Sequence, residues 1–327
     1  MVAALEKVEA ARRGVSLTYF EFGTLAAFVA FEQAGVQDWV LEVGLGGRLD
    51  AVNVLDADCA VITSIDIDHI GFLGDNRESI GFEKAGILRP GIVAVCADPE
   101  PPSSVLQQAA AQKVVLQRVG ESYRLVPGGQ TSDPVMLQFE GESVALPAGP
   151  LPVESVAAGV VLIHVLEPSV PLATLAQQAA GIRVAGRFEQ LSEQPALYVD
   201  VGHNPHAARW LARRLQPMKA AGRGITAVFS ALADKDVEGV MAAMAPVVDE
   251  WHLAPLAVPR GLSAAQLVAR ADTVSGGQPA VHTSVNDALD AVWGSAEPSD
   301  VVIVFGSFFT VAAARAWWFA QSDRPAS

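Results

Sequence analysis

The stretch CAVITSIDIDH, residues 59–69, decides the fold class, because a short apolar run passes directly into acids and a histidine. An apolar run bounded by Asp58 and Ser64 is typical of a buried strand. The residues that follow, ending in His69, are ones that a buried strand does not need. Ligands of open α/β sheets gather at the carboxyl ends of the strands. The stretch therefore predicts a parallel α/β sheet with a functional edge.

Similar runs surround this stretch. WVLEV, residues 39–43, and IVAVC, residues 92–96, each predict a further buried strand, and the apolar spacing over 20–35 predicts a helix. Residues 114–150 lose this rhythm and predict small antiparallel strands or an irregular excursion, whereas 153–166 again predicts a helix. Alternating strands and helices favour a parallel sheet with right-handed crossovers.

A second alternation begins near residue 187 and predicts a self-sufficient α/β sheet domain. The predicted strands cover residues 197–201, 225–229, 250–253 and 300–305. The predicted helices cover residues 206–215, 237–248, 263–271 and 284–293, with a final helix after Gly306-Ser307. We place the domain boundary so that residues 1–183 form the first domain and residues 184–327 the second.

Composition excludes several classes of protein. The chain has 327 residues, 51% of them hydrophobic, and a net charge of −14. No basic cluster exceeds pairs such as Arg213-Arg214, so a nucleic-acid partner is not expected. No window reaches the roughly 18 apolar residues of a membrane span, and the start lacks a leader pattern. Cys59 and Cys96 lie in apolar runs, which favours buried free thiols over a disulfide and a reducing, cytoplasmic setting.

Three residues near the predicted sheet edge are candidates for a divalent-metal site. Glu42 follows an apolar run and precedes a glycine-rich turn, so it binds a cation there or pairs with Arg48. His69 stands beside acids and is either a metal ligand or a structural histidine. Lys84 is an exposed helix residue, a phosphate contact or, if carbon dioxide carbamylates it, an anionic oxygen ligand suited to magnesium.

The second half offers a candidate anion site. Arg187 presents a guanidinium fork for phosphate oxygens, and Asp200 ends a strand where carboxylates accept hydrogen bonds from ribose hydroxyls. His203 begins a turn, completed by an Asn-Pro pair, before a helix whose N-terminus favours anions. An ordinary strand-to-helix turn explains that turn equally well. The charged loop 234–236 is interpreted as solvated.

These segments resemble one known family. GGRLDAVN, SIDIDHIGFLG, ESIGFEKAGI, AGRFE, DVGHNPHA, LADKD and VFGSFFTV occur in this order along most of the chain. Together they resemble the folylpolyglutamate synthase/dihydrofolate synthase branch of the Mur ligase superfamily. The resemblance implies a parallel-sheet ATPase-like central domain, incomplete in this chain, followed by a Rossmann-like C-terminal domain.

The resemblance also implies a reaction. A carboxylate attacks the γ-phosphate of ATP to give an acyl phosphate, and the amine of L-glutamate then displaces phosphate. Two magnesium ions would be held by Glu42, His69 and carbamylated Lys84, while Arg187 and Asp200 would contact ATP with His203 beside them. Lys84 and His203 would be the catalytic residues. The expected partners are dihydropteroate, folates, L-glutamate and ATP, without nucleic acid or membrane, for a cytoplasmic monomer.

A further part of the resemblance concerns the substrate. Thr18, Tyr19, Phe20 and Glu21, together with Asp50 and Ala51, match the dihydropteroate-binding wall of the family. Glu154 stands where the family usually has an asparagine near the adenine, which would change that contact or leave it to water.

One family motif is absent from the chain. No Gly-x-x-x-x-Gly-Lys-Ser/Thr occurs, although the family carries a P-loop of the type GTNGKGS. We therefore expect the chain to be a truncated or mis-started form of a full ligase that binds ATP poorly by itself. One alternative is a degenerate, non-catalytic relative that keeps a folate or nucleotide surface. Another is a fragment of a peptidoglycan-type ligase, against which the LDAVN and TYFE segments argue.

Overall fold

The computed structural model describes residues 1–128, 134–146, 148–271 and 278–322, and the chain divides into two compact units. Unit 1 comprises Met1–Pro127, Val135–Leu146 and Glu154–Gln177, and unit 2 consists chiefly of Gln178–Ser327. The two units are each an α/β structure, as the alternation of strands and helices predicts. The boundary between residues 183 and 184 remains a prediction.

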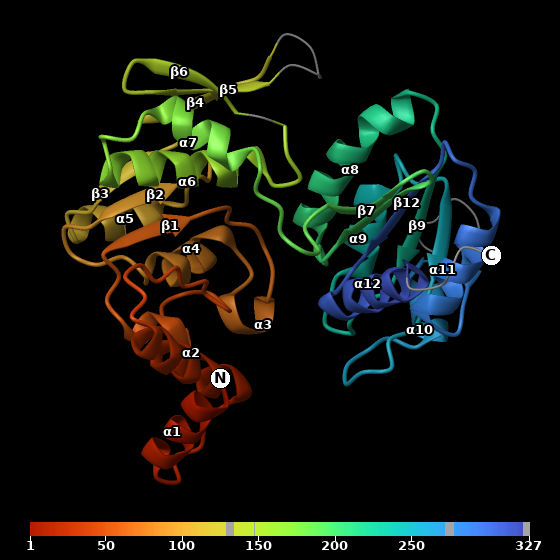
Figure 1. Ribbon diagram of the computed structural model, residues 1–327, viewed down its shortest axis with the longest axis horizontal. Coiled ribbons are helices and arrows are strands. Elements are labelled where there is room, and N and C mark those ends of the chain that lie inside the picture. Colours follow the sequence, from red (N-terminus) through yellow and green to blue (C-terminus); the bar gives the residue numbers. More distant parts are fainter. Residues whose placement is uncertain (129–133, 147, 272–277, 323–327) are drawn as a thin grey trace. The chain divides into compact units, whose positions relative to one another are not determined.

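Unit 1 is built on a parallel sheet with the strand order β1-β2-β3 (Figure 1). Its strands are β1 (Cys59–Ile62), β2 (Val93–Cys96) and β3 (Val115–Arg118). A separate antiparallel sheet contains β4 (Tyr123–Val126), β5 (Val135–Phe139) and β6 (Glu142–Leu146). The helices are α1 (Val2–Arg12), α2 (Tyr19–Ala34), α3 (Ile70–Leu73), α4 (Arg77–Ala85), α5 (Ser103–Ala111), α6 (Val153–Leu166) and α7 (Leu172–Ala179), with a 3₁₀ turn at Ala51–Val54.

The core of unit 1 lies between the parallel sheet and two helices. Ile62 of β1 and Cys96 of β2 pack with Ile80 of α4 and Val105 of α5, and all four are almost completely buried. Apolar residues on one face of each short helix create this layer, since they can be buried only against the sheet. Helix α4 is thereby packed against the sheet and against Ile65, which lies on the segment that leads from β1 to His69.

One predicted strand does not form. Residues 39–43 have no strand partner among the residues that the structure describes, and Val40 is 95% exposed. An apolar run becomes a strand only where a neighbouring strand supplies hydrogen bonds, and β1 is paired on one side only, with β2. The prediction of a buried strand at 39–43 is therefore wrong for this structure.

Unit 2 is a doubly wound sheet with the strand order β11-β10-β9-β12-β8-β7. The strands are β7 (Glu189–Glu193), β8 (Ala196–Asp200), β9 (Ile225–Phe229), β10 (Glu250–Leu253), β11 (Ala280–Val281) and β12 (Val301–Phe305). All neighbours are parallel except β7, which pairs antiparallel with β8 at the edge. The helices are α8 (Pro205–Ala220), α9 (Val237–Met244), α10 (Ala264–Ala271), α11 (Val285–Ser295) and α12 (Phe308–Ser322).

The central strand β12 divides the core of unit 2 into two layers. Ile303 and Phe305 pack with residues of α8, α9 and α10, whereas Val302 and Val304 pack with residues of α11 and α12. Successive side chains of a strand point to opposite faces, so an unbroken apolar strand needs helices on both sides. Figure 1 shows these helices flanking the sheet of unit 2.

The two free cysteines differ in burial. Cys96 is buried and Cys59 is half-buried, and both are free. Burial raises the pKa of both thiols. Within the described ranges, no helix has the length and apolar character that crossing a membrane would require.

Candidate functional site

The glycine-rich loop at residues 44–50 is held against the C-terminal end of α4. Gly47 has φ of 153°, and a Cβ there would lie 2.9 Å from the carbonyl oxygen of Glu83. The backbone N–H of Arg48 donates to that same oxygen at 2.8 Å. Only glycine permits this φ together with such a close approach of two backbones. The loop is therefore fixed in position by the helix that carries Lys84.

Glu42 lies before this loop and does not pair with Arg48. The Arg48 guanidinium instead binds both carboxylate oxygens of Glu83, at 2.9 to 3.2 Å. Glu42 is exposed, and in the described part of the chain it makes no hydrogen bond or ion pair. The idea of a Glu42–Arg48 pair and of a buried Glu42 is therefore wrong, and its carboxylate is available to bind a cation.

His69 lies seven residues beyond the end of β1, with Asp68 beside it. Its φ of 53° is in the left-handed region, and it precedes the first turn of α3. Asp68 Oδ1 accepts a hydrogen bond from the His69 backbone at 2.7 Å, and Asp68 Oδ2 lies 3.9 Å from His69 Nε2. A non-glycine residue in this region is strained, and such strain is concentrated at functional sites.

Lys84 lies on the last turn of α4, within range of the charge of this carboxylate. Burial lowers the pKa of the Lys84 ammonium, and the charge of Asp68 opposes that shift. Of the three predicted metal ligands, the structure thus brings His69 and Lys84 to the same carboxylate. Asp68 was noted in the sequence only as a neighbour of His69, and a two-residue Asp-His pair after a strand is the signal that identifies it.

The predicted substrate wall combines structural and exposed groups. Thr18 and Glu21 form a reciprocal capping box at the start of α2, since each side chain accepts from the other's backbone N–H. Tyr19 is 97% exposed. The ring of Phe20 packs so close to Gly44 that a Cβ there would lie 2.6 Å from Cζ.

Asp50 organises the other half of this wall. Its Oδ2 accepts from Leu45 N at 2.8 Å and its Oδ1 from Val52 N at 3.0 Å. Asp50 thereby caps the 3₁₀ turn that begins at Ala51 and holds the glycine-rich loop closed. Its role in the described structure is to fix the loop beside α2.

In unit 2, Asp200 ends β8 as predicted and is buried. Its Oδ2 accepts from Phe188 N at 2.7 Å and its Oδ1 from Gly202 N at 2.6 Å. Burial raises the pKa of Asp200, and the two backbone donors and the charge of Arg187 oppose that shift. The carboxylate therefore joins the segment before β7 to the segment after β8.

Arg187 and His203 flank this carboxylate in sequence. The Arg187 guanidinium lies over the ring of Phe308, with Cζ 5.7 Å from the ring centre. His203 Nδ1 lies 3.0 Å from the carbonyl oxygen of Val201, and this geometry favours the tautomer that carries its proton on Nδ1. The Arg187–Phe308 contact was missed in the sequence, because 121 residues separate the two and no local pattern links them.

Two loops of unit 2, the turn at Asn204 and the loop 234–236, also have simpler interpretations from the sequence. Asn204 is the N-cap of α8 and its side chain accepts a hydrogen bond from Ala207 N, with Pro205 in the first turn. The predicted strand-to-helix turn is therefore present. The solvated interpretation of 234–236 is wrong for Lys235, which is only 9% exposed. Asp236 caps α9 through Gly239 N.

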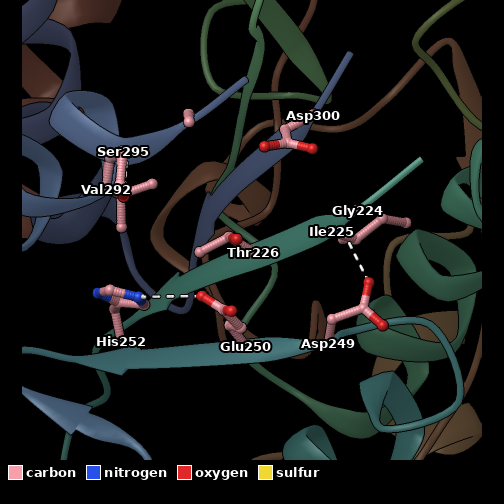
Figure 2. Close-up of a pocket in the computed structure, with 10 residues that line it drawn as sticks. Gly224, Ile225, Thr226, Asp249, Glu250, His252, Val292, Ser295 and Asp300 are labelled. Atoms are coloured by element: carbon pink, nitrogen blue, oxygen red, sulfur yellow. Dashed lines mark hydrogen bonds and ion pairs between the residues drawn. The ribbon is translucent and has the colours of Figure 1, made fainter. Parts of the chain in front are cut away.

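A pocket of about 280 Å³ lies elsewhere in unit 2 (Figure 2). It is lined by residues that begin β9 and β10 or precede β12, including Thr226, His252 and Asp300, together with part of α11. Ligands of doubly wound sheets bind at the carboxyl ends of the strands, and this pocket is at the amino ends. None of the predicted site residues lines it.

Comparison with known proteins places this geometry in a family. Residues 186–308 match the family described as Mur ligase, glutamate ligase domain. Over 312 residues the chain is 41% identical to the dihydrofolate synthase/folylpolyglutamate synthase of Escherichia coli strain K12, covering 95% of this chain and 72% of that protein. The protein of the same name from Haemophilus influenzae is 38% identical over 318 residues, covering 91% of this chain and 72% of that protein.

Solved structures agree with these relatives. E. coli FolC in complex with DHPP and ADP has a TM-score of 0.90 and 38% identity, covering 98% of this chain and 76% of that chain. The Yersinia pestis bifunctional folylpolyglutamate synthase/dihydrofolate synthase, complexed with AMPPNP and Mn ion, has a TM-score of 0.85 and 40% identity, covering 96% and 74%. The chain therefore belongs to the dihydrofolate synthase/folylpolyglutamate synthase family of ATP-dependent glutamate ligases.

Proposed function

We propose that this chain joins L-glutamate to dihydropteroate, to folates or to both, using ATP and an acyl-phosphate intermediate. The observation that carries the proposal is Lys84, a lysine of lowered pKa placed beside Asp68 on the helix that holds the glycine-rich loop. The names of the relatives and the ligands of their structures, ADP, DHPP, AMPPNP and L-glutamate, support the choice of substrates.

The cation side of this site would be formed by Glu42, His69 and Lys84. Glu42 offers an exposed carboxylate and His69 an imidazole, both of which suit a divalent cation. As an ammonium, Lys84 would repel a cation. A lowered pKa increases the fraction of neutral amine, which adds carbon dioxide and releases a proton to give an anionic carbamate. With Lys84 carbamylated, the three side chains offer the oxygen and nitrogen ligands that suit a divalent cation.

We propose two magnesium ions at this side, supported by the Mn ion in the Yersinia relative. When bound, such ions neutralise charge that develops on the transferred phosphoryl group. Asp68 would keep the His69 segment in place through its hydrogen bond from the His69 backbone and its approach to the His69 ring.

Binding of the substrates would be divided among the other predicted residues. The exposed rings of Tyr19 and Phe20 are suited to stack on a flat pterin, while the capping box and Asp50 hold these elements still. Arg187 would bind phosphate oxygens, because its guanidinium is a fixed fork supported by the Phe308 ring. Asp200 would fix the nucleotide-binding edge of unit 2 through its two backbone hydrogen bonds, and His203 would lie beside it at that edge.

In the reaction, a carboxylate oxygen of the substrate bonds to the γ-phosphorus while the bond to the ADP oxygen breaks. The amine nitrogen of L-glutamate then bonds to the acyl carbon, phosphate leaves with the attacking oxygen, and one proton is released. We also propose that the protein acts as a cytoplasmic monomer without nucleic-acid or membrane partners, supported by its net charge of −14.

The test is a ligation assay with the protein of the complete reading frame, dihydropteroate, L-glutamate, ATP and Mg²⁺. We expect dihydrofolate and ADP in equal amounts by mass spectrometry, and replacing dihydropteroate with a folate separates the two activities. Glu42→Gln should abolish product. The control Glu32→Gln, which changes an exposed glutamate of α2 away from the proposed cation site, should not. Absence of ADP formation, or a fully active Glu42→Gln variant, would refute the proposal.

A further inference from the structure

Helix α4 begins with an arginine that the proposed reaction does not use. Arg77 Nη2 donates to both carboxylate oxygens of Asp98 at 2.8 Å, and Arg77 Nε donates to the carbonyl oxygen of Ile65 at 2.9 Å. Asp98 lies two residues beyond β2, and its Oδ2 accepts from the Ile65 N–H at 2.8 Å. A single ion pair therefore holds both backbone groups of Ile65.

This ion pair is well satisfied and partly buried. The Asp98 side chain is 4% exposed and that of Arg77 is 38% exposed. Asp98 Oδ1 also accepts from Glu100 N at 3.0 Å, and Arg77 Nη2 donates to the Glu100 carbonyl at 3.1 Å. A buried carboxylate is tolerated only with such partners, and loss of one partner leaves the other charge uncompensated.

The position of this pair links the two halves of the proposed cation site. Ile65 lies four residues before His69, on the segment that leaves the carboxyl end of β1. Arg77 lies seven residues before Lys84, which places their Cα atoms about 10.5 Å apart along the axis of α4, on the same face of the helix. The pair thus fixes the segment of His69 relative to the helix of Lys84.

We propose that Arg77 and Asp98 are positioning residues of the ligase, which set the separation of His69 and Lys84. This inference rests on the cation site proposed above. Partners that orient metal ligands from behind are typically worth about 10–100-fold in metal affinity. Arg77 and Asp98 act one step further back, through the backbone of Ile65, and we expect an effect of about tenfold at the lower end of that range.

The test is Mn²⁺ binding to the full chain, followed by electron paramagnetic resonance of the free ion. Asp98→Asn keeps an acceptor for Ile65 but loses the charge, and Arg77→Lys keeps the charge but cannot bond Asp98 and Ile65 together. We expect both variants to bind Mn²⁺ about tenfold more weakly. Circular dichroism selects a temperature at which every variant is folded.

The matched control is Glu78→Gln, one residue further along α4. Its carboxylate caps α5 through the backbone N–H groups of Ser103 and Ser104, so its loss is purely structural. We expect this variant to bind Mn²⁺ as the wild type does. If it weakens Mn²⁺ binding as much as Asp98→Asn, the positioning role is overturned.

A second control separates this inference from the proposed function. If His69→Ala leaves Mn²⁺ binding unchanged, the proposed cation site itself is wrong. If His69→Ala weakens binding while Arg77→Lys and Asp98→Asn bind as the wild type does, only the positioning role is wrong. Weaker binding in all three variants, with Glu78→Gln unaffected, supports both.

Discussion

Replacing Gly86 with alanine should separate the glycine-rich loop from α4. Gly86 follows α4 with φ −64° and ψ −7°, a conformation that alanine adopts without strain. A Cβ there would lie 2.3 Å from Arg48 Cβ and 2.6 Å from Arg48 Cα, whereas ordinary contact begins at 3.4 Å. Because one of these atoms is backbone, a side-chain rotation cannot relieve the overlap, and loop and helix must move apart by about 1 Å.

The magnitude follows from three effects. Overpacking of this kind costs about 1–3 kcal/mol. The movement also strains the hydrogen bond from Arg48 N to Glu83 O, which contributes about 1 kcal/mol. Alanine restricts the unfolded chain and returns about 0.4–1 kcal/mol. We therefore expect the unfolding free energy of this region to fall by about 1–3 kcal/mol.

Hydrogen exchange resolved by peptide is the suitable assay, because it reports unit 1 separately. A loss of about 1–3 kcal/mol raises the opening equilibrium of the peptides around residues 44–50 and α4 by about 5–150-fold. The control is Gly159→Ala in α6, where a Cβ meets nothing within 4 Å, and which should stabilise its helix by about 0.5–1 kcal/mol. Unchanged exchange in Gly86→Ala would refute the reasoning.

Three further predictions follow from the same structure. Burial lowers the pKa of Lys84 below its ordinary 10.5, so the unfolded chain binds this proton more tightly than the folded chain. The free energy of unfolding should therefore rise with pH between the lowered pKa and 10.5, and denaturant titrations of Lys84→Met should lack this rise. Thr18→Ala removes the N-cap acceptor of α2 and should cost about 1 kcal/mol, measured by hydrogen exchange of that helix, and an unaffected helix would contradict the capping role. Gly306→Ala at φ 115° places Cβ 2.0 Å from the Ser230 carbonyl oxygen and should lower the unfolding free energy of unit 2 by about 3 kcal/mol or more, whereas Gly294→Ala, with nothing within 4 Å, should not; calorimetry decides between them.

The sequence predicts elements well where the pattern is local. The strands at 225–229 and 250–253 and the helix at 153–166 have the bounds that their apolar runs indicate. The prediction from sequence fails where strand formation depends on pairing with another strand. Residues 39–43 form no strand, because no strand pairs with them in the described structure. Edge strand β7 was also missed, since its polar residues lack a strand pattern.

The candidate site divides in the same way. His69 and Asp200 were identified from their residue types and from their positions relative to predicted strands. The structure places His69 after β1 and Asp200 at the end of β8. Contacts between distant residues could not be predicted, among them Arg48 with Glu83 and Arg77 with Asp98. Such ion pairs depend on how α4 packs against the sheet, which no local spacing encodes.

The central claim is ligation through an acyl phosphate, and the fate of one oxygen atom tests it most directly. Dihydropteroate labelled with ¹⁸O in its carboxylate is converted by the protein of the complete reading frame with ATP and L-glutamate, and the released phosphate is analysed by mass spectrometry. The account predicts one ¹⁸O in each phosphate, because the carboxylate oxygen that attacks the γ-phosphorus leaves with it. Phosphate without label, formed together with ligated product, would contradict the account.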